Sequence, residues 1–124
     1  MLDQIYEALI ADTLINQKAA GRIKFYEYPE TSSMTDTHII IDPLDTPRPS
    51  DYADNKWLTE DFMYQIEVWS KSITDRDAIA KRIQHIMWDL NFFNDGGGVD
   101  EWDKDLNIYR DARRYRGKTY VDTV

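Results

Sequence analysis

Hydrophobic residues recur along this chain of 124 residues with two different periods. From Asp3, a residue type that caps helices, to about Lys18 they return every three or four positions, and Gly21 follows as a stop signal, so this segment is predicted to be a helix. From Phe62 to Trp69 they alternate, which predicts a strand with one side packed on helices. The recurring positions are Leu2, Ile5, Tyr6, Leu9 and Thr13 in the helix and Phe62, Tyr64, Ile66 and Val68 in the strand.

A second helix is expected from Thr74 to about Leu90. Thr74 and Asp77 resemble a capping box with Asp in place of Glu. Trp88 projects about 150° away from the apolar stripe of this helix, so it is either covered by the C-terminal part of the chain or left for a partner. The stripe consists of Ile79, Ile83, Ile86, Met87 and Leu90.

Two short β-type runs, Ile23–Tyr28 and His38–Asp42, flank a stretch that begins with the turn-rich residues Pro29–Ser33. They are predicted to form a hairpin. A polar loop is then expected from Asp42 to about Asn55. Its prolines lower the entropy of holding it in one shape, and loops of this length inside compact domains are usually functional or mobile.

A last β-rich unit is expected after the glycine triplet at 96–98. Val99–Trp102 and Leu106–Tyr115 are predicted to pair around the turn at 103–105, with Lys118–Val121 as a short extension. The whole pattern predicts an α+β fold in which two helices pack on one face of a largely antiparallel sheet. A single domain over residues 1–124 is expected, because no repeat, low-complexity tract or linker divides the chain.

Composition narrows the class of protein. The chain has no cysteine, which excludes disulfides and thiolate chemistry and suits assembly in a reducing cytosol. The N-terminus has neither a basic segment nor a long apolar stretch, so neither a signal peptide nor a membrane span is expected. A net charge of -8 disfavours a protein that coats nucleic acid over its whole surface.

The charge is divided between an acidic body and a basic segment near the C-terminus. Residues 1–109 carry a net charge of -11, whereas residues 110–118 carry +4. Complementary patches of this kind favour head-to-tail binding between copies of the chain, in a ring or a stack. The alternative is that the arginines pair with acidic neighbours inside one subunit, where exposed ion pairs contribute little.

Residues with catalytic or metal-binding potential do not form a recognisable motif. His38 and His85 have no cysteine to join in a zinc site. The acidic turn at 103–107 opens like a calcium loop, but Ile108 and Arg114 occupy the positions that require Gly and Glu. The glycine triplet is not a phosphate loop, and nothing places the adjacent acids Asp100 and Glu101 in a dry pocket. We therefore expect no enzyme activity, no metal and no cofactor.

Three stretches of the chain are distinctive. They are residues 41–55, which contain Ile-Asp-Pro-Leu-Asp and Ser-Asp-Tyr-Ala-Asp-Asn, residues 64–70, Tyr-Gln-Ile-Glu-Val-Trp-Ser, and residues 108–117, Ile-Tyr-Arg-Asp-Ala-Arg-Arg-Tyr-Arg-Gly. Together they resemble a family of small tail components of siphophages and prophages of Gram-positive bacteria, similar in fold to tail terminator (tail completion) proteins. The resemblance covers almost the whole chain.

The resemblance implies a virion protein assembled in the host cytoplasm. Tail terminators close into a hexameric ring on the finished tail tube, stop its growth and join it to the head connector, leaving a channel for DNA. Head-completion (stopper) proteins of the neck are similar in size and remain an alternative. A ring of identical subunits uses a heterologous interface in which an acidic surface can meet a basic one. The residues predicted to form that interface are Arg110, Arg113, Arg114, Arg116, Asp42, Asp45, Asp51, Asp54, Trp88 and Trp102.

Two other uses of these residues remain open. The arginines could line the channel and touch DNA, with binding that falls steeply as salt rises. In a remote alternative, the chain is a small metal-dependent enzyme with a metal held by Asp42, Asp45 or Asp51. Trp69 is a further aromatic residue that either packs inside the subunit or is buried on assembly.

Overall fold

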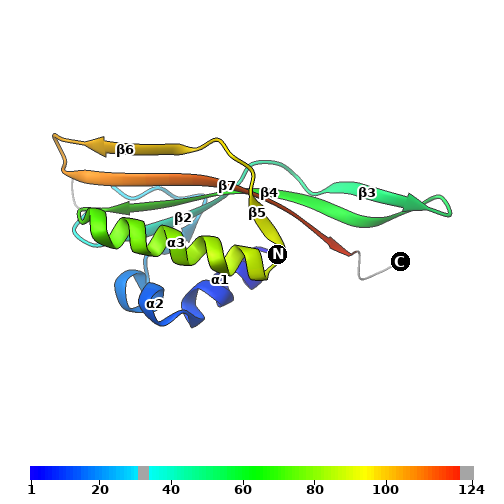
Figure 1. Ribbon diagram of the computed structural model, residues 1–124, viewed down its shortest axis with the longest axis horizontal. Helices are drawn as coiled ribbons and strands as arrows, with labels where there is room; N and C mark the ends of the chain where they lie inside the picture. The colour runs from blue at the N-terminus through cyan, green and yellow to red at the C-terminus, as the bar shows by residue number, and fades with distance from the viewer. Residues whose placement is uncertain (31–33, 121–124) are drawn as a thin grey trace.

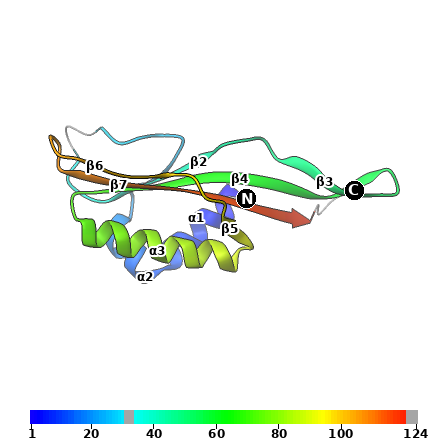
Figure 2. The same ribbon diagram turned by 45° about the horizontal axis from the view of Figure 1, so that its top comes forward.

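The computed structural model describes residues 1–30 and 34–120. It confirms the predicted α+β fold: one largely antiparallel sheet is covered on one face by helices, as Figures 1 and 2 show. None of the described helices is long and apolar enough to cross a membrane. The elements are α1 (Leu2–Ala11), α2 (Thr13–Ala19), β1 (Ile23–Phe25), β2 (His38–Pro43), β3 (Arg48–Ala53), β4 (Lys56–Ser70), α3 (Ile73–Asp89), β5 (Phe92–Asn94), β6 (Val99–Asp103) and β7 (Ile108–Tyr120).

The long strands β4 and β7 form the centre of the sheet. They pair antiparallel without interruption from Thr59↔Tyr120 to Ser70↔Tyr109. The path across the sheet is β1-β2-β4-β7-β5. In addition, β3 pairs with residues 56–61 at the start of β4, and β6 pairs with residues 108–112 at the start of β7. The register of β4 with each neighbour is constant, so alternate residues of β4 lie on opposite faces along its whole length.

The core lies between the sheet and the helices. The predicted inner side of β4 is confirmed, because Tyr64, Ile66 and Val68 are buried there and Phe62 packs at its margin. The predicted stripe of α3 is confirmed as well, since Ile79, Ile83 and Met87 are buried, and Ile86 and Leu90 pack against the core. Other buried members come from α1, α2, β2, β5 and β7: Ile5, Leu9, Ile15, Ile39, Ile41, Phe92 and Tyr115.

The first helix is divided, so the sheet carries three helices and not the two predicted. Asp12 has an extended conformation and its carboxylate accepts a hydrogen bond from the backbone N–H of Ile15 at 3.1 Å, which caps α2. The side chain of Arg82 on α3 also donates to this carboxylate. Asp favours caps over helix interiors, and this tertiary contact holds the break in place.

The prediction of a hairpin between residues 23–28 and 38–42 is wrong. β1 ends at Phe25 and runs parallel to β2, with Ile23 opposite Ile39. Tyr26 has a positive φ of 65°, which ends the strand. Parallel neighbours cannot be joined by a tight turn, so the parallel pairing excludes the hairpin. Thr31–Ser33, which belonged to the predicted turn, lie outside the described residues.

The expected loop from Asp42 to Asn55 is also largely wrong, because β2 extends to Pro43 and β3 occupies half of the rest. Asp54 and Asn55 both have positive φ, 50° and 62°, and Ala53 pairs with Lys56 on either side of them. This is the geometry of a two-residue hairpin turn, for which Asp and Asn are suited. The hairpin extends past the helices together with the end of β7; we call residues 48–61 and 118–120 the arm (Figures 1 and 2).

The predicted cap of α3 is wrong, whereas the predicted C-terminal hairpin is present. The cap of α3 is Ser72 and not Thr74, since Ser72 Oγ accepts from the N–H of Asp75 at 3.2 Å. The pairing of β6 with β7 confirms the predicted last unit, and Asp103 Oδ1 accepts from two backbone N–H groups in its turn. The described extension of β7 reaches Tyr120; Val121 lies outside the described residues.

Candidate functional site

The basic segment of β7 is distributed over both faces of the sheet. Tyr115 faces the core, and residues at even positions therefore point away from the helices. Arg113 lies on the helix side, where its guanidinium donates to Gln84 of α3 at 2.6 Å. Four of the five basic side chains are on the outer face: Arg110, Arg114, Arg116 and Lys118.

Arg110 is held inside the subunit by a buried carboxylate. Glu67 has no exposed surface, and it accepts hydrogen bonds from Arg110 Nε at 2.5 Å, Trp69 Nε1 at 3.0 Å, Gln65 Nε2 at 2.9 Å and Tyr28 Oη at 3.0 Å. Burial raises the pKa of Glu67, but these donors outweigh burial and the net pKa is lowered. The guanidinium also lies over the Trp69 ring. Through Glu67, this hydrogen-bonded cluster connects Tyr28 to strands β4 and β7.

Arg113 is likewise engaged within the subunit. Its Nε lies 3.1 Å from Asp111 Oδ1, and the Asp111 side chain is buried. Burial raises the pKa of Asp111 and outweighs the opposing effect of Arg113. On the same side, Arg76 of α3 binds Asp100 at 2.6 Å and lies over the Tyr109 ring. These contacts join β6 and β7 to α3.

The remaining cations of the segment are more exposed. Arg116 pairs with Asp95 at 3.2 Å, and Lys118 pairs with Asp51 at 3.0 Å. Arg114 donates to Gln65 Oε1 at 3.2 Å and has no carboxylate partner in the described part of the chain. The alternative of pairing inside one subunit therefore holds for all of the predicted arginines except Arg114.

The predicted acidic residues do not gather in one place. Asp42 accepts from Tyr28 Oη at 3.1 Å, Asp45 pairs with Arg48 at 2.8 Å, and Asp51 accepts from Thr59 at 2.6 Å. Asp54, at the arm turn, has no partner among the described residues. In residues 1–30 and 34–120, no group of three or more acidic or histidine side chains is placed to hold a metal ion.

A groove runs beside α3 on the helix side of the sheet. It has a volume of about 630 Å³ and is lined by Asp77, Lys81, Gln84, His85 and Trp88 of α3 and by Arg113 of β7. Trp88 is 68% exposed, so the described C-terminal part of the chain does not cover it. Trp102 is 55% exposed, although it stacks on Tyr109 with ring centroids 6.0 Å apart. Trp69 packs inside the subunit against Tyr28.

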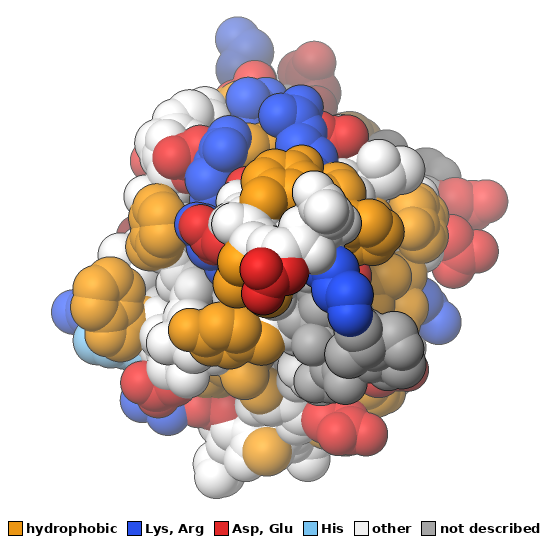
Figure 3. All heavy atoms as spheres, turned by 90° about the vertical axis from the view of Figure 1, so that its right-hand side faces the viewer, with side chains coloured by type: hydrophobic (Ala, Val, Ile, Leu, Met, Phe, Trp, Pro, Cys, Tyr) orange, Lys and Arg blue, Asp and Glu red, His pale blue; other side chains and the backbone are white. Residues whose placement is uncertain are grey.

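The arm carries a second group of exposed aromatic residues, which sequence analysis did not single out. Tyr52 is 70% exposed, Trp57 49% and Tyr120 81%. Tyr52 and Trp57 are cross-strand partners. Seen end-on from the arm side, hydrophobic side chains lie at the surface among charged ones (Figure 3). The Asp54-Asn55 turn signal between two short β-type runs is the feature that could have located this hairpin.

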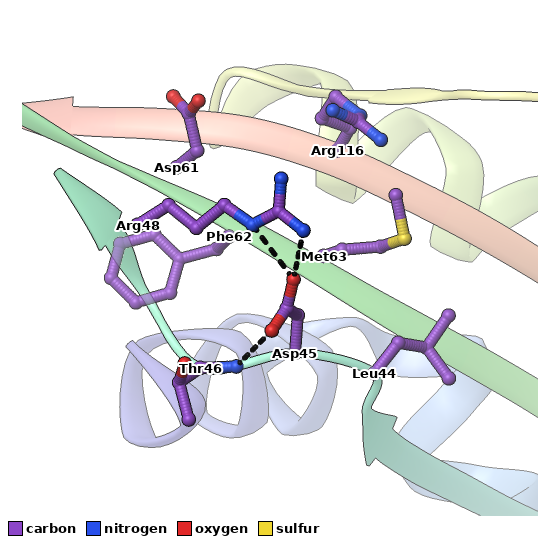
Figure 4. A pocket seen from close by; sticks show the side chains of 8 residues that line it. All are labelled: Leu44, Asp45, Thr46, Arg48, Asp61, Phe62, Met63 and Arg116. Carbon is purple, nitrogen blue, oxygen red and sulfur yellow. Dashed lines mark hydrogen bonds and ion pairs between the residues drawn. The ribbon is translucent and has the colours of Figure 1, made fainter. Parts of the chain in front are cut away.

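A small pocket lies at the root of the arm. Its volume is about 130 Å³. Figure 4 shows Asp45 bonded to Arg48 on one wall, with the Asp61 carboxylate directed away from this pair. Asp61 Oδ1 is buried and has no hydrogen-bond partner in the structure. Pockets for small ligands typically exceed about 300 Å³. The features that stand out are thus two exposed aromatic surfaces, the arm and the groove, and not an enclosed site.

Comparison with known proteins finds similarity to a solved structure. No protein-family model matches this chain, and no curated protein matches it in sequence. Among solved structures, the fold is similar to that of a chain in the virion of a native gene transfer agent particle, with a TM-score of 0.56 and 12% sequence identity. The similarity covers 94% of this chain and 92% of that chain. It shows a shared fold; the narrower resemblance to Gram-positive siphophage tail components stays a prediction.

Proposed function

We propose that this protein is a structural component of a phage or phage-like virion, and that its copies form a ring at the head-proximal end of a tail. In this role it stops growth of the tail tube and joins the tail to the head. The observation that carries the proposal is the fold shared with a chain of a gene transfer agent virion over nearly the full length of both chains. The exposed aromatic surfaces support it, since such residues are enriched at protein interfaces.

A neck position next to the terminator is the second candidate. A stopper protein would use the same kind of ring but would bind the head connector and not the tail tube. The shared fold with a gene transfer agent virion chain is compatible with either position. Binding to one or the other partner separates the two roles.

The test is the mass of the purified protein in solution, measured by light scattering on a sizing column. The protein is measured alone, with the tail tube protein of the same virion, and with its head connector protein. A complex of about six copies, free or on the tube protein, is the result expected for a terminator. Six copies on the connector alone would identify a stopper, and a monomer in all three samples would overturn the proposal.

Arg114 gives the cleanest single-residue test of the predicted basic interface. Reversal at Arg110 or Arg113 would disturb the buried carboxylates of Glu67 or Asp111, whereas Arg114 is exposed and bonds only Gln65. Arg114→Glu is expected to leave a folded monomer that no longer assembles. Lys24→Glu makes the same charge change at an exposed position of β1 and should assemble normally. Normal assembly of Arg114→Glu would remove this residue from the interface.

A further inference from the structure

We propose that the arm of one copy lies lengthwise in the groove beside α3 of the next copy. The inference rests on the proposed function, because it requires copies of the chain to associate. It assigns the two surfaces of the head-to-tail contact: β3 and the first part of β4 on one side, and α3 with β7 on the other. The predicted residues Asp54 and Trp88 fall on opposite sides of this contact.

The arm lacks support inside its own subunit. The helices cover only the other end of the sheet, and every residue from Asp51 to Leu58 is exposed. A β-ribbon with two bare faces is marginal in water, and it gains stability when one face packs on another surface. Three large aromatic side chains, Tyr52, Trp57 and Tyr120, are available for that packing.

The groove lacks a covering element. Its floor is the helix side of β7 at Arg113, and one wall is the outward surface of α3 from Asp77 to Trp88. Trp102, on β6, is paired with Tyr109 and adds a second exposed indole to this side of the hairpin. No other helix in the described chain lies alongside α3 here, so the groove is open to a partner (Figure 1).

The length of the groove matches the distal part of the arm. From Phe62 at the margin of the core to Asn55 at the turn, the arm is about 23 Å long at about 3.3 Å per residue. From Asp77 to Trp88 the groove is about 16 Å long at about 1.5 Å per residue. The groove therefore accommodates the distal two thirds or so of the arm, which is the part that carries Tyr52 and Trp57.

The unpaired charges of the two surfaces are complementary. At the tip of the arm, Asp54 has no partner among the described residues, while Lys56 and Glu60 lie on the face opposite Trp57. In the groove, Lys81 is exposed and has no carboxylate partner among the described residues, while Asp77 is already bound to Arg76. The unpaired carboxylate at the arm tip thus matches the unpaired ammonium group of Lys81, which favours contact between copies.

The geometry forbids the same contact within one subunit. The arm points away from α3, so its turn cannot reach that subunit's own groove (Figures 1 and 2). A contact between two different surfaces of identical subunits is heterologous; it builds a ring when the rotation between subunits closes and an open filament when it does not. The arm and groove therefore give each subunit one donor surface and one acceptor surface.

Cysteine cross-linking tests this assignment directly, because the natural chain has no cysteine. Asp54→Cys is combined with His85→Cys or, one turn earlier on α3, with Lys81→Cys. The oligomeric fraction, alone or on the tail tube protein, is oxidised and run on a non-reducing gel. At least one pair is expected to give a ladder of covalent multimers, since disulfides form only where Cα atoms come within about 7 Å. Asp54→Cys with Lys24→Cys is the control and should give no ladder.

The outcomes separate this inference from the proposed function. If oligomers form but neither groove pair gives more cross-linking than the control, the arm does not lie in the groove and the ring proposal stands. If no oligomer forms in any sample, both proposals fall. Cross-links in the groove pairs alone support both.

A charge swap provides a second test that does not depend on disulfide geometry. Lys81→Glu is expected to raise the protein concentration needed for half-assembly at least tenfold, because it places a carboxylate opposite Asp54 of the arm. Combining it with Asp54→Lys should recover most of that loss. An unchanged assembly concentration in Lys81→Glu would contradict the arm and groove contact.

Discussion

The two ends of the sheet are built from the same long strands but have different surroundings. At the body end, β4 and β7 are covered by three helices, and their inner residues Tyr64, Ile66 and Tyr115 are buried. At the arm end, β4 continues past the helices, and Leu58, which lies on the same face as Tyr64 and Ile66, is 45% exposed. The difference teaches that alternation within a strand determines which residues share a face, while the covering layer determines whether that face contributes to folding or to binding.

The largest expected difference between the two ends concerns folding. Ile83→Ala, in the core under the sheet, is expected to lower the free energy of unfolding by about 3 kcal/mol through lost burial and a cavity. Leu58→Ala on the arm removes an exposed side chain and should cost less than about 1 kcal/mol. Urea unfolding followed by circular dichroism measures both. Equal losses would mean that the arm belongs to the folding core.

The buried carboxylate of the body should make stability depend on pH. Glu67→Gln is expected to lower the free energy of unfolding by about 2 kcal/mol at pH 7, since it weakens charge-assisted hydrogen bonds to Arg110 and Trp69. The pKa of Glu67 is lowered in the folded protein, so its stabilisation is fully present above its ordinary pKa of 4.5 and is lost as pH falls through the folded value.

The measurement is urea unfolding of wild type and Glu67→Gln between pH 3 and pH 7. The gap between the two proteins should be widest at pH 7 and should narrow only below about pH 4.5. A gap that stays constant to pH 3 would show that the carboxylate is not the group responsible. Aspartates elsewhere contribute to both proteins alike and cancel in the comparison.

The smallest expected effect on folding, but a clear one on assembly, comes from the arm aromatics. Trp57→Ala should leave the free energy of unfolding of the monomer within about 1 kcal/mol of wild type, because the indole is half exposed. It should weaken assembly by more than about 1 kcal/mol if the side chain is central to the contact. Light scattering over a dilution series measures this. Ile10→Ala, an exposed position on α1, is the matched control, and equal effects of the two would exclude a special role for the arm.

Much of the fold could be predicted from local patterns. The inner side of β4, the stripe of α3 and the β6–β7 hairpin depend on residues close in sequence, and all three are present. Two errors arose where distant residues decide the outcome. Asp12 breaks the first helix while Arg82 binds it across the fold, and β1 lies parallel to β2, where two neighbouring β-type runs had predicted an antiparallel hairpin.

The candidate surfaces were predictable only in part. Trp88 was identified from its angle on α3, and the structure leaves it exposed. The arm was hidden because a run of polar residues and prolines resembles a loop, although the Asp54-Asn55 turn indicates a hairpin. The partners of Arg110 and Arg116 were not predictable, because Glu67 and Asp95 lie far from them in sequence.

By itself the sequence determined the α+β class, the amphipathic elements and the concentration of arginines near the C-terminus, since these follow from composition and from periods of two or about 3.6 residues. Only the tertiary structure decided which arginines are engaged and which surfaces are left over. The register of β4 against β7 puts Arg110 on the buried Glu67 and leaves Arg114 without a carboxylate. The physical reason is that pairing and burial depend on the register of strands brought together from distant parts of the chain.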